Sequence, residues 1–287
     1  MKPAPFDYAA PTSIAEALTL LDDDSIVIAG GQTLVPMLAM RMARPERVVD
    51  INNIAELSGI ADNGDEIVIG AGTRQADVLA SSLVAEKLPL LKQAISFVGH
   101  SQTRNRGTVG GSLAHADPAA EIPLAALAMD AEVSLQSTGG SRRVSVDDFL
   151  IGPMMTAREP EELLTHVHFP IFADGTRVST SFHEMSERHG DFAMVAAAAR
   201  LHIDSGGICQ KAALALGGVD ARALRVPALE TTLIGQQITD DVLQAALAEI
   251  PSAIDPGSDQ HASADYRRRV AMTLAERAIK DANGGAA

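Results

Sequence analysis

One short segment gathers residue types that are used in catalysis and in ligand binding. Residues 107–126 read GTVGGSLAHADPAAEIPLAA, with twin glycines, a histidine and two acids. Asp117 and Glu121 could carry general acid–base chemistry, or could accept hydrogen bonds from sugar or ribityl hydroxyls. No nucleophile or metal-ligand set accompanies them, and His115 is better explained as a loop or packing residue. The glycines, which let a backbone approach a ligand closely, are therefore the stronger guide to function.

An earlier segment has the same design. AGGQT, at residues 29–33, follows the short apolar run SIVIA, which predicts a buried strand, and precedes a helical pattern. Gly30 and Gly31 lack the Cβ atoms that would hold a ligand away, and they tolerate positive φ. A helix that begins near Thr33 would turn its unpaired N–H groups toward the same point. The candidate residues for an anion site, most simply for phosphate, are Ala29, Gly30, Gly31, Gln32 and Thr33.

The later segment, TVGGS, would complete a diphosphate site. Thr108 and Ser112 can donate hydroxyl hydrogen bonds beside the glycine amides. Two separated glycine nests can hold a diphosphate from both sides, which favours a dinucleotide such as FAD over a mononucleotide. The candidate residues here are Thr108, Val109, Gly110, Gly111 and Ser112.

Two further patterns give weaker interpretations. IVIGAGTRQ, at residues 67–75, begins like a dinucleotide fingerprint. Gln75 stands at the third glycine position, however, and Asp77 comes too early to bind a ribose, so a tight strand-to-helix turn is the better interpretation. His166 and His168 would share one face of a strand, but no third metal ligand accompanies them.

Composition and charge exclude several classes of protein. The 287 residues suffice for two domains with buried cores, and 46% of them are hydrophobic. A formal net charge of −14 argues against nucleic-acid binding. The single cysteine, Cys209, excludes an internal disulfide, a cysteine-based zinc site or an iron–sulfur cluster held by this chain alone, and it is expected to be a small buried hydrophobe. Without a signal-peptide core or an apolar run that could span a bilayer, the chain is expected in the cytoplasm.

The remaining patterns predict alternating helices and strands. RVVDI, EIVIGAG and EELLTHVHFP are expected strands, AEVSLQS and GSRRVSV an expected hairpin, and residues 73–98 are expected to be helical. Residues 172–182 are rich in turn formers, which places a domain boundary near residues 170–178. The helix at residues 263–282 would align an apolar face of Tyr266, Val270, Leu274 and Ala278.

With both glycine segments in hand, the sequence resembles the FAD-binding medium subunit of the molybdenum hydroxylases. This family includes aerobic carbon monoxide dehydrogenase and bacterial N-heterocycle hydroxylases, with the flavin domain of xanthine dehydrogenase as a more distant relative. The resemblance covers essentially the whole chain and is carried by FDYAAPTSIAEAL, AGGQTLVPML, PERVVDI, QTRNRGTVGGSLAHADPAAEIP, ERHGDFAMVAAA and the helix with Tyr266 and Arg267. The ordered pair AGGQT and TVGGS is specific, whereas either segment alone is not.

The resemblance implies roles for individual residues. Residues 29–33 and 108–112 would bind the FAD pyrophosphate. Glu121 stands where relatives usually have an aspartate that hydrogen-bonds the ribityl chain. Phe192 occupies a position near the isoalloxazine that is tyrosine in carbon monoxide dehydrogenase, so the ring is kept and the phenol donor is lost. Around His183 and Glu184, relatives tend to carry a lysine that this chain does not have.

The fold implied by the resemblance is α+β. It comprises a two-lobed FAD-binding domain of the vanillyl-alcohol-oxidase (PCMH) type at residues 1–175, with lobes at about 1–55 and 56–175. A C-terminal domain of the carbon monoxide dehydrogenase flavoprotein type, with a small antiparallel sheet and helices, would occupy residues 176–287.

The implied function is electron transfer within a larger complex. This chain would take electrons from 2Fe-2S clusters of a small partner subunit and pass them through FAD to a terminal acceptor. A large partner would hold molybdopterin, and the complex would be a dimer of heterotrimers. One alternative is a stand-alone FAD-dependent oxidoreductase of the same fold. Another is an assembly subunit that has lost its flavin, against which the intact glycines argue. The sequence leaves the substrate and the acceptor open.

Overall fold

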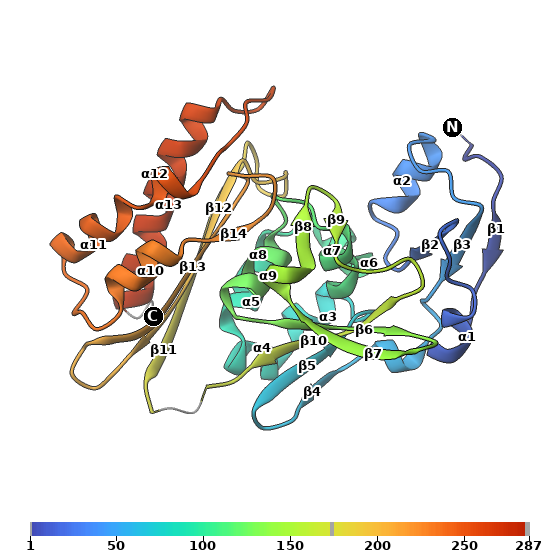
Figure 1. Ribbon diagram of the computed structural model, residues 1–287, viewed down its shortest axis with the longest axis horizontal. Coiled ribbons are helices and arrows are strands. Elements are labelled where there is room, and N and C mark those ends of the chain that lie inside the picture. The colour runs from blue at the N-terminus through green and yellow to red at the C-terminus, as the bar shows by residue number, and fades with distance from the viewer. Residues whose placement is uncertain (1, 173–174, 285–287) are drawn as a thin grey trace.

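The computed structural model describes residues 2–172 and 175–284. Three main sheets follow one another along the chain, each with its own helices, and in Figure 1 they run from the N-terminal sheet at the right to the C-terminal sheet at the left. Helices and strands are mixed throughout, so the predicted α+β class is confirmed. Within the described ranges, no helix combines the length and the apolar composition needed to cross a membrane.

The N-terminal lobe is a small parallel sheet. Its elements are β1 (Asp7–Ala9), α1 (Ile14–Leu18), β2 (Ser25–Ile28), α2 (Leu34–Ala39) and β3 (Arg47–Asp50), with strand order β1-β3-β2. The Ser13 hydroxyl caps α1 by accepting from the Glu16 amide at 3.2 Å. Apolar residues of α1 and β3 form the core beneath the sheet. The lobe thereby fixes the loop between β2 and α2, which holds the first glycine segment.

The second lobe pairs a fully antiparallel sheet with a layer of helices (Figure 1). The strand order is β4-β5-β10-β6-β7. The strands are β4 (Ile60–Asp62), β5 (Glu66–Gly70), β6 (Glu132–Ser137), β7 (Gly140–Ser145) and β10 (Leu163–Pro170), with a separate small hairpin of β8 (Leu150–Gly152) and β9 (Met155–Thr156). The helices are η1 (Ala55–Leu57), α3 (Gln75–Ala80), α4 (Ser82–Lys87), α5 (Pro89–Phe97), α6 (Ser101–Arg106), α7 (Val109–His115), α8 (Glu121–Ala128) and α9 (Val146–Phe149).

The helical segment at residues 73–98 is confirmed as helical but not as one helix. It divides into α3, α4 and α5. Ser81 is extended, with ψ 126°, and its hydroxyl caps α4 by accepting from the Val84 amide. Pro89, which has no N–H to donate, begins α5. The breaks let three short helices pack on the sheet where one straight helix would pass over it.

The C-terminal part is an antiparallel sheet covered by helices. The strands β11 (Arg177–Met185), β12 (Val195–Ile203), β13 (Cys209–Gly217) and β14 (Leu224–Arg225) pair in that order. The helices are α10 (Pro227–Leu233), α11 (Asp240–Leu247), α12 (Ile250–Ala253) and α13 (Ala264–Gly284). All nine residues of β12 are buried, because α13 covers one face of the sheet and helices α5 and α8 cover the other. Cys209 is buried, as expected.

One local expectation in this part is wrong, and another is confirmed only in part. The segment at residues 172–182 was expected to be turns, but β11 begins at Arg177, and residues 173 and 174 lie outside the described residues. Its Ser and Thr side chains suit a strand as well as a turn, and pairing with β12 decides the outcome. In α13, the predicted face is confirmed in part, because Leu274 and Ala278 are buried while Tyr266 and Val270 are half-buried. The buried face is wider than predicted and also contains Arg267, Ala271, Ala275, Ile279 and Ala282. Arg267 can be buried because it donates to the Gly218 carbonyl at 2.9 Å.

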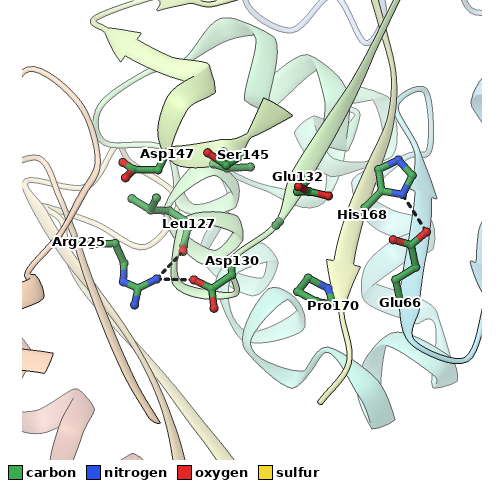
Figure 2. Close-up of a pocket in the computed structure, with 11 residues that line it drawn as sticks. Glu66, Leu127, Asp130, Glu132, Ser145, Asp147, His168, Pro170 and Arg225 are labelled. Atoms are coloured by element: carbon green, nitrogen blue, oxygen red, sulfur yellow. Dashed lines mark hydrogen bonds and ion pairs between the residues drawn. The ribbon is translucent and has the colours of Figure 1, made fainter. Parts of the chain in front are cut away.

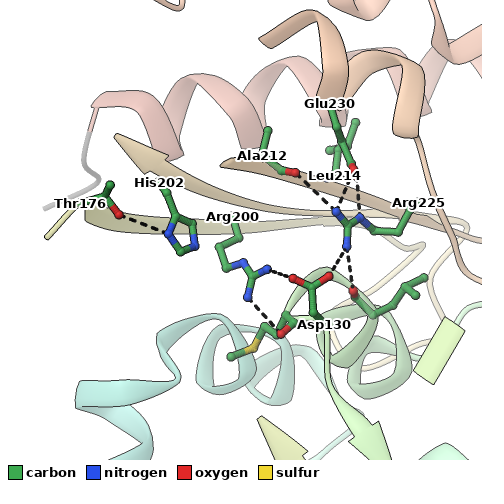
Figure 3. Close-up of polar contacts among 10 residues, drawn as sticks. Asp130, Thr176, Arg200, His202, Ala212, Leu214, Arg225 and Glu230 are labelled. Atoms are coloured by element: carbon green, nitrogen blue, oxygen red, sulfur yellow. Dashed lines mark hydrogen bonds and ion pairs between the residues drawn. The ribbon is translucent and has the colours of Figure 1, made fainter. Parts of the chain in front are cut away.

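A charged network joins the C-terminal sheet to the preceding domain (Figure 3). Asp130, after α8, pairs with Arg200 of β12, and it accepts from Arg225 of β14 at 2.7 Å. Arg225 also forms two hydrogen bonds with Glu230 of α10, at 2.5 and 2.8 Å. Arg200 is only 6% exposed. The carboxylate that neutralises this buried cation therefore comes from the other domain.

Candidate functional site

The two glycine segments pack directly against each other. A Cβ added to Gly30 would overlap the carbonyl oxygen of Arg106 and would lie 2.8 Å from the Gly107 Cα. A Cβ on Gly111 would lie 3.9 Å from the Cβ of Ala29. The structure therefore brings together residues 29–33 and 106–112. Glycine at position 30 is required by the approach of the chain to itself, before any ligand is considered.

The first glycine segment presents unpaired backbone donors. Gly31 has φ +71°, and its carbonyl accepts from the Val35 amide at 3.1 Å. Within residues 2–172 and 175–284, none of the N–H groups of residues 30–34 donates to another residue. Thr33 is the N-cap of α2 but makes no side-chain cap hydrogen bond, so its hydroxyl is also available. A row of unpaired N–H groups at a helix start is a good site for an anion.

The second glycine segment differs from the expectation of a second amide nest. Four of its five amides already donate within the chain: Val109 to the Thr73 carbonyl, Gly110 to the Ala71 carbonyl, Gly111 to the Thr108 hydroxyl and Ser112 to the Thr108 carbonyl, over 2.9–3.2 Å. A Cβ on Gly110 would overlap the Cβ of Ala71. What this segment can offer a ligand is the hydroxyl protons of Thr108 and Ser112.

Polar contacts of Asn52 and Arg74 join the two glycine segments to the neighbouring loops. The Asn52 side chain donates to the Ala29 carbonyl at 2.8 Å and accepts from Arg74 at 2.6 Å. Arg74 also donates to the Arg106 carbonyl. Asp50 accepts from Tyr8 at 2.6 Å, and although burial raises its pKa, hydrogen bonds from Tyr8 and Asn52 lower it overall. A cavity of about 410 Å³ opens here, lined in part by Ala29, Asn52 and Arg74. Arg74 thus places a cation close to the candidate anion site.

Sequence reasoning missed Asn52 and Arg74. Asn52 belongs to no motif, Arg74 lies in IVIGAGTRQ without a role in that pattern, and the contacts that join them to the glycine segments span 22 or more residues. The only signal was position: Asn52 follows a strand end and Arg74 precedes a helix, where side chains commonly bond to loop backbone.

Glu121 lies at the start of α8, six residues after α7 ends, and is 9% exposed. Burial raises the pKa of Glu121 to about 7; its own backbone N–H lowers this pKa, and the charge of Asp117 raises it. Phe192 is 78% exposed, in the loop between β11 and β12. That loop touches the start of α6, because a Cβ on Gly190 would lie 2.6 Å from the ring of His100. Both residues therefore border the region that leads from α6 to α8.

A second polar cluster resembles a Ser–His–Glu arrangement, of which Figure 2 shows His168 and Glu66. The Ser134 hydroxyl lies 2.7 Å from His168 Nε2, and Glu66 Oε1 lies 3.2 Å from Nδ1, beside a cavity of about 370 Å³. Arg143, always a donor, lies 2.8 Å from Nδ1. Nδ1 must therefore accept, so Nε2 carries the proton and cannot deprotonate the serine. Burial, followed by Arg143, lowers the pKa of His168. Among the described residues, no group of three or more potential ligands could hold a metal, at His166 and His168 or elsewhere.

The mixed fold, the open amides and the adjoining hydroxyls together define a nucleotide-binding flavoprotein subunit with a C-terminal sheet domain. The chain belongs to the molybdenum hydroxylase flavoprotein family. Residues 4–172 match the FAD binding domain in molybdopterin dehydrogenase, and residues 180–282 match the carbon monoxide dehydrogenase flavoprotein C-terminal domain. The predicted family is confirmed, and the chain is an oxidoreductase subunit with an FAD-binding domain.

Individual relatives agree with this assignment over nearly their whole length. The chain is 40% identical over 285 residues to the 6-hydroxypseudooxynicotine dehydrogenase complex subunit alpha of Paenarthrobacter nicotinovorans, covering 98% of this chain and 96% of that one. It is 35% identical to the carbon monoxide dehydrogenase medium chain of Hydrogenophaga pseudoflava, covering 98% of each.

Solved structures agree as well. Carbon monoxide dehydrogenase from Hydrogenophaga pseudoflava superposes with a TM-score of 0.95 at 36% identity, covering 100% of each chain. Quinoline 2-oxidoreductase from Pseudomonas putida 86 gives a TM-score of 0.93 at 37% identity, covering 100% of this chain and 99% of that one. The predicted PCMH-type fold of the FAD-binding domain is confirmed.

The residues present fit FAD. The unpaired amides of residues 30–34 and the Arg74 cation suit a diphosphate, and positive φ at Gly31 opens the loop for its approach. The hydroxyls of Thr108 and Ser112 add donors from the facing segment. Glu121 supplies a buried acceptor without a partner among the described side chains. Donors for an anion and an acceptor for hydroxyls are the two kinds of group that a dinucleotide needs.

Proposed function

We propose that the chain binds FAD through residues 29–33 and 108–112 and serves as the electron-transfer subunit of a molybdenum hydroxylase. The observation that carries the proposal is the row of unpaired amides at residues 30–34, in a loop that packs against the segment with the Thr108 and Ser112 hydroxyls. In a chain of this family, such a row is the natural position for the cofactor pyrophosphate.

The chain's own residues bind and orient the cofactor. The amides of residues 30–34 would hold the diphosphate, and Arg74 would offset part of its charge. Glu121 would accept from the ribityl hydroxyls, and Phe192 would cover the ring system as an exposed aromatic side chain. When bound, FAD supplies the exchange of electrons between one-electron carriers and a two-electron acceptor.

The names of two relatives, a complex subunit alpha and a medium chain, support a place for this chain in a larger enzyme. A small subunit with 2Fe-2S clusters would deliver electrons to this chain, and a large subunit with molybdopterin would carry out the hydroxylation. The single cysteine, Cys209, is buried, with its pKa raised by burial to about 11, so the clusters must be bound elsewhere. A dimer of heterotrimers in the cytoplasm is the proposed assembly.

The test is expression of this chain with FAD, alone and together with the two partner subunits. The chain alone should show a flavin spectrum at one FAD per chain and no turnover of heterocycles or carbon monoxide with an artificial acceptor. Turnover should appear on coexpression. Turnover by the chain alone would instead favour a stand-alone oxidoreductase of the same fold, and a colourless chain would contradict FAD binding.

A further inference from the structure

Two acidic side chains meet where the FAD-binding domain packs on the C-terminal sheet. Glu121 begins α8, which packs against β12 and β13. Glu184 lies on β11, directly opposite Ala196 of β12. The two carboxyls are close enough for the charge of Glu121 to act on Glu184. No sequence pattern links Glu121 and Glu184, because 63 residues separate them.

The direction of Glu184 follows from its strand neighbours. Side chains alternate along a strand, so Glu184 shares its face with Phe182 and opposes that of His183. Phe182 packs in the core of the FAD-binding domain, with its ring 5.4 Å from that of Phe97. His183 lies on the other face, 2.8 Å from Asp281 of α13. Glu184 therefore points toward the FAD-binding domain and Glu121.

Neither carboxyl has a basic partner. Glu121 is 9% exposed and bonds only to its own backbone N–H, while Oε2 of Glu184 is buried without a hydrogen-bond partner. Neither forms an ion pair within residues 2–172 and 175–284. The groups that act on the pair are Asp117, whose charge raises the pKa of Glu121, and Ser186, whose hydrogen bond lowers that of Glu184. A buried carboxylate oxygen without a donor is costly.

Electrostatics then limits the protonation of the pair. Two desolvated carboxylates in close proximity cannot both ionise cheaply, so they titrate as one unit. Burial, followed by the Glu121 charge, raises the pKa of Glu184 to about 8. Oε2 of Glu184 is buried without a donor, whereas Glu121 accepts from its own backbone N–H, so the geometry favours the proton on Glu184.

We propose that Glu121 and Glu184 share one proton at neutral pH, with Glu184 as a neutral acid and Glu121 as the carboxylate that accepts from FAD. Glu184 is then a positioning residue, which acts through Glu121. The part that concerns FAD rests on the proposed function, whereas the shared proton concerns the chain alone.

The first experiment is infrared spectroscopy of the FAD-loaded full chain at neutral pH. The carbonyl stretch of a protonated carboxyl should be present in the wild type, lost in Glu184→Gln and retained in Asp117→Asn. Absence of the band in the wild type, or an unchanged band in Glu184→Gln, would overturn the proposal.

The second experiment measures the FAD dissociation constant from neutral to alkaline pH. Loss of the shared proton puts a second negative charge beside an anionic cofactor. The wild-type constant should therefore rise, by up to about tenfold per pH unit for one proton. Glu184→Gln should flatten this dependence, while Asp117→Asn should keep it. An equal dependence in wild type and Glu184→Gln would reject the proposal. If no variant bound FAD at any pH, the proposed function would fail, and the infrared band of the FAD-free chain would still decide the shared proton.

Discussion

The two glycine segments look alike in sequence, yet they use their backbone differently. In residues 29–33 the amides are left open and the glycine at position 31 has positive φ. In the second segment the amides of residues 109–112 are bonded within the chain, and Gly110 packs closely against Ala71. The first segment is therefore organised for a ligand, and the second is organised to hold the first in place and to add two hydroxyls. Glycine pairs can thus serve a ligand or the packing of the chain itself.

The largest expected effect is a loss of folding stability when a glycine of the second segment is replaced. Gly110→Ala should destabilise the FAD-free chain by about 3 kcal/mol, because the new Cβ overlaps Ala71, whose backbone cannot move aside easily. Urea unfolding measures this. Gly139→Ala is the matched control, since its nearest neighbour would be 3.6 Å away and little change is expected. Equal stability of the two variants would mean that the second segment is not a packing element.

The next largest effect is expected for Gly31, in the glycine segment that is proposed to bind FAD. Gly31→Ala should cost about 1–2 kcal/mol of stability, because alanine is strained at φ +71°. Its FAD affinity should fall further than that of Gly110→Ala after correction for the folded fraction. Flavin titration by absorbance and fluorescence provides the comparison. The opposite ranking would show that the first segment does not contact the cofactor.

Thr33 and Thr108, the N-cap residues of α2 and α7, provide a second comparison of the two segments. Thr108→Val removes the hydroxyl that accepts from the Gly111 amide at 3.0 Å and should cost about 1 kcal/mol of stability. Thr33→Val should be nearly neutral in stability, because Thr33 makes no side-chain cap hydrogen bond. Thermal unfolding of the FAD-free chains distinguishes them, with Thr108→Ser as the variant that restores the cap. If Thr33→Val were also destabilised, the two threonines would not differ in their contribution to stability.

The smallest effect concerns Ser112. Its hydroxyl has no partner among the described residues, so Ser112→Ala should leave stability unchanged. FAD affinity should fall by about 1 kcal/mol, or roughly fivefold, if the hydroxyl donates to the cofactor. Calorimetric titration resolves a change of this size. Unchanged affinity would limit the second segment to positioning the first.

Sequence predicted the two glycine segments and the order of most strands because these depend on local patterns. It could not predict which amides remain open, because the acceptors for Val109 and Gly110 come from another loop. The pairing of Glu121 with Glu184 was invisible for the same reason. The strand at Arg177 was missed, and the buried face of α13 was predicted too narrow, because tertiary contacts outweighed local preference.

The Asp130 network makes the stability of the two domains depend on each other. Arg200 is buried in the C-terminal sheet, and its counter-charge is supplied by the domain before it. Within the intact chain, loss of the Asp130 carboxylate would leave the Arg200 guanidinium buried without its counter-charge, a defect that commonly costs several kcal/mol. A chimera that takes one domain from a relative would meet this penalty wherever the relative lacks the matching charge. Such a chimera should therefore be most stable when Asp130, Arg200 and Arg225 are kept together as a set.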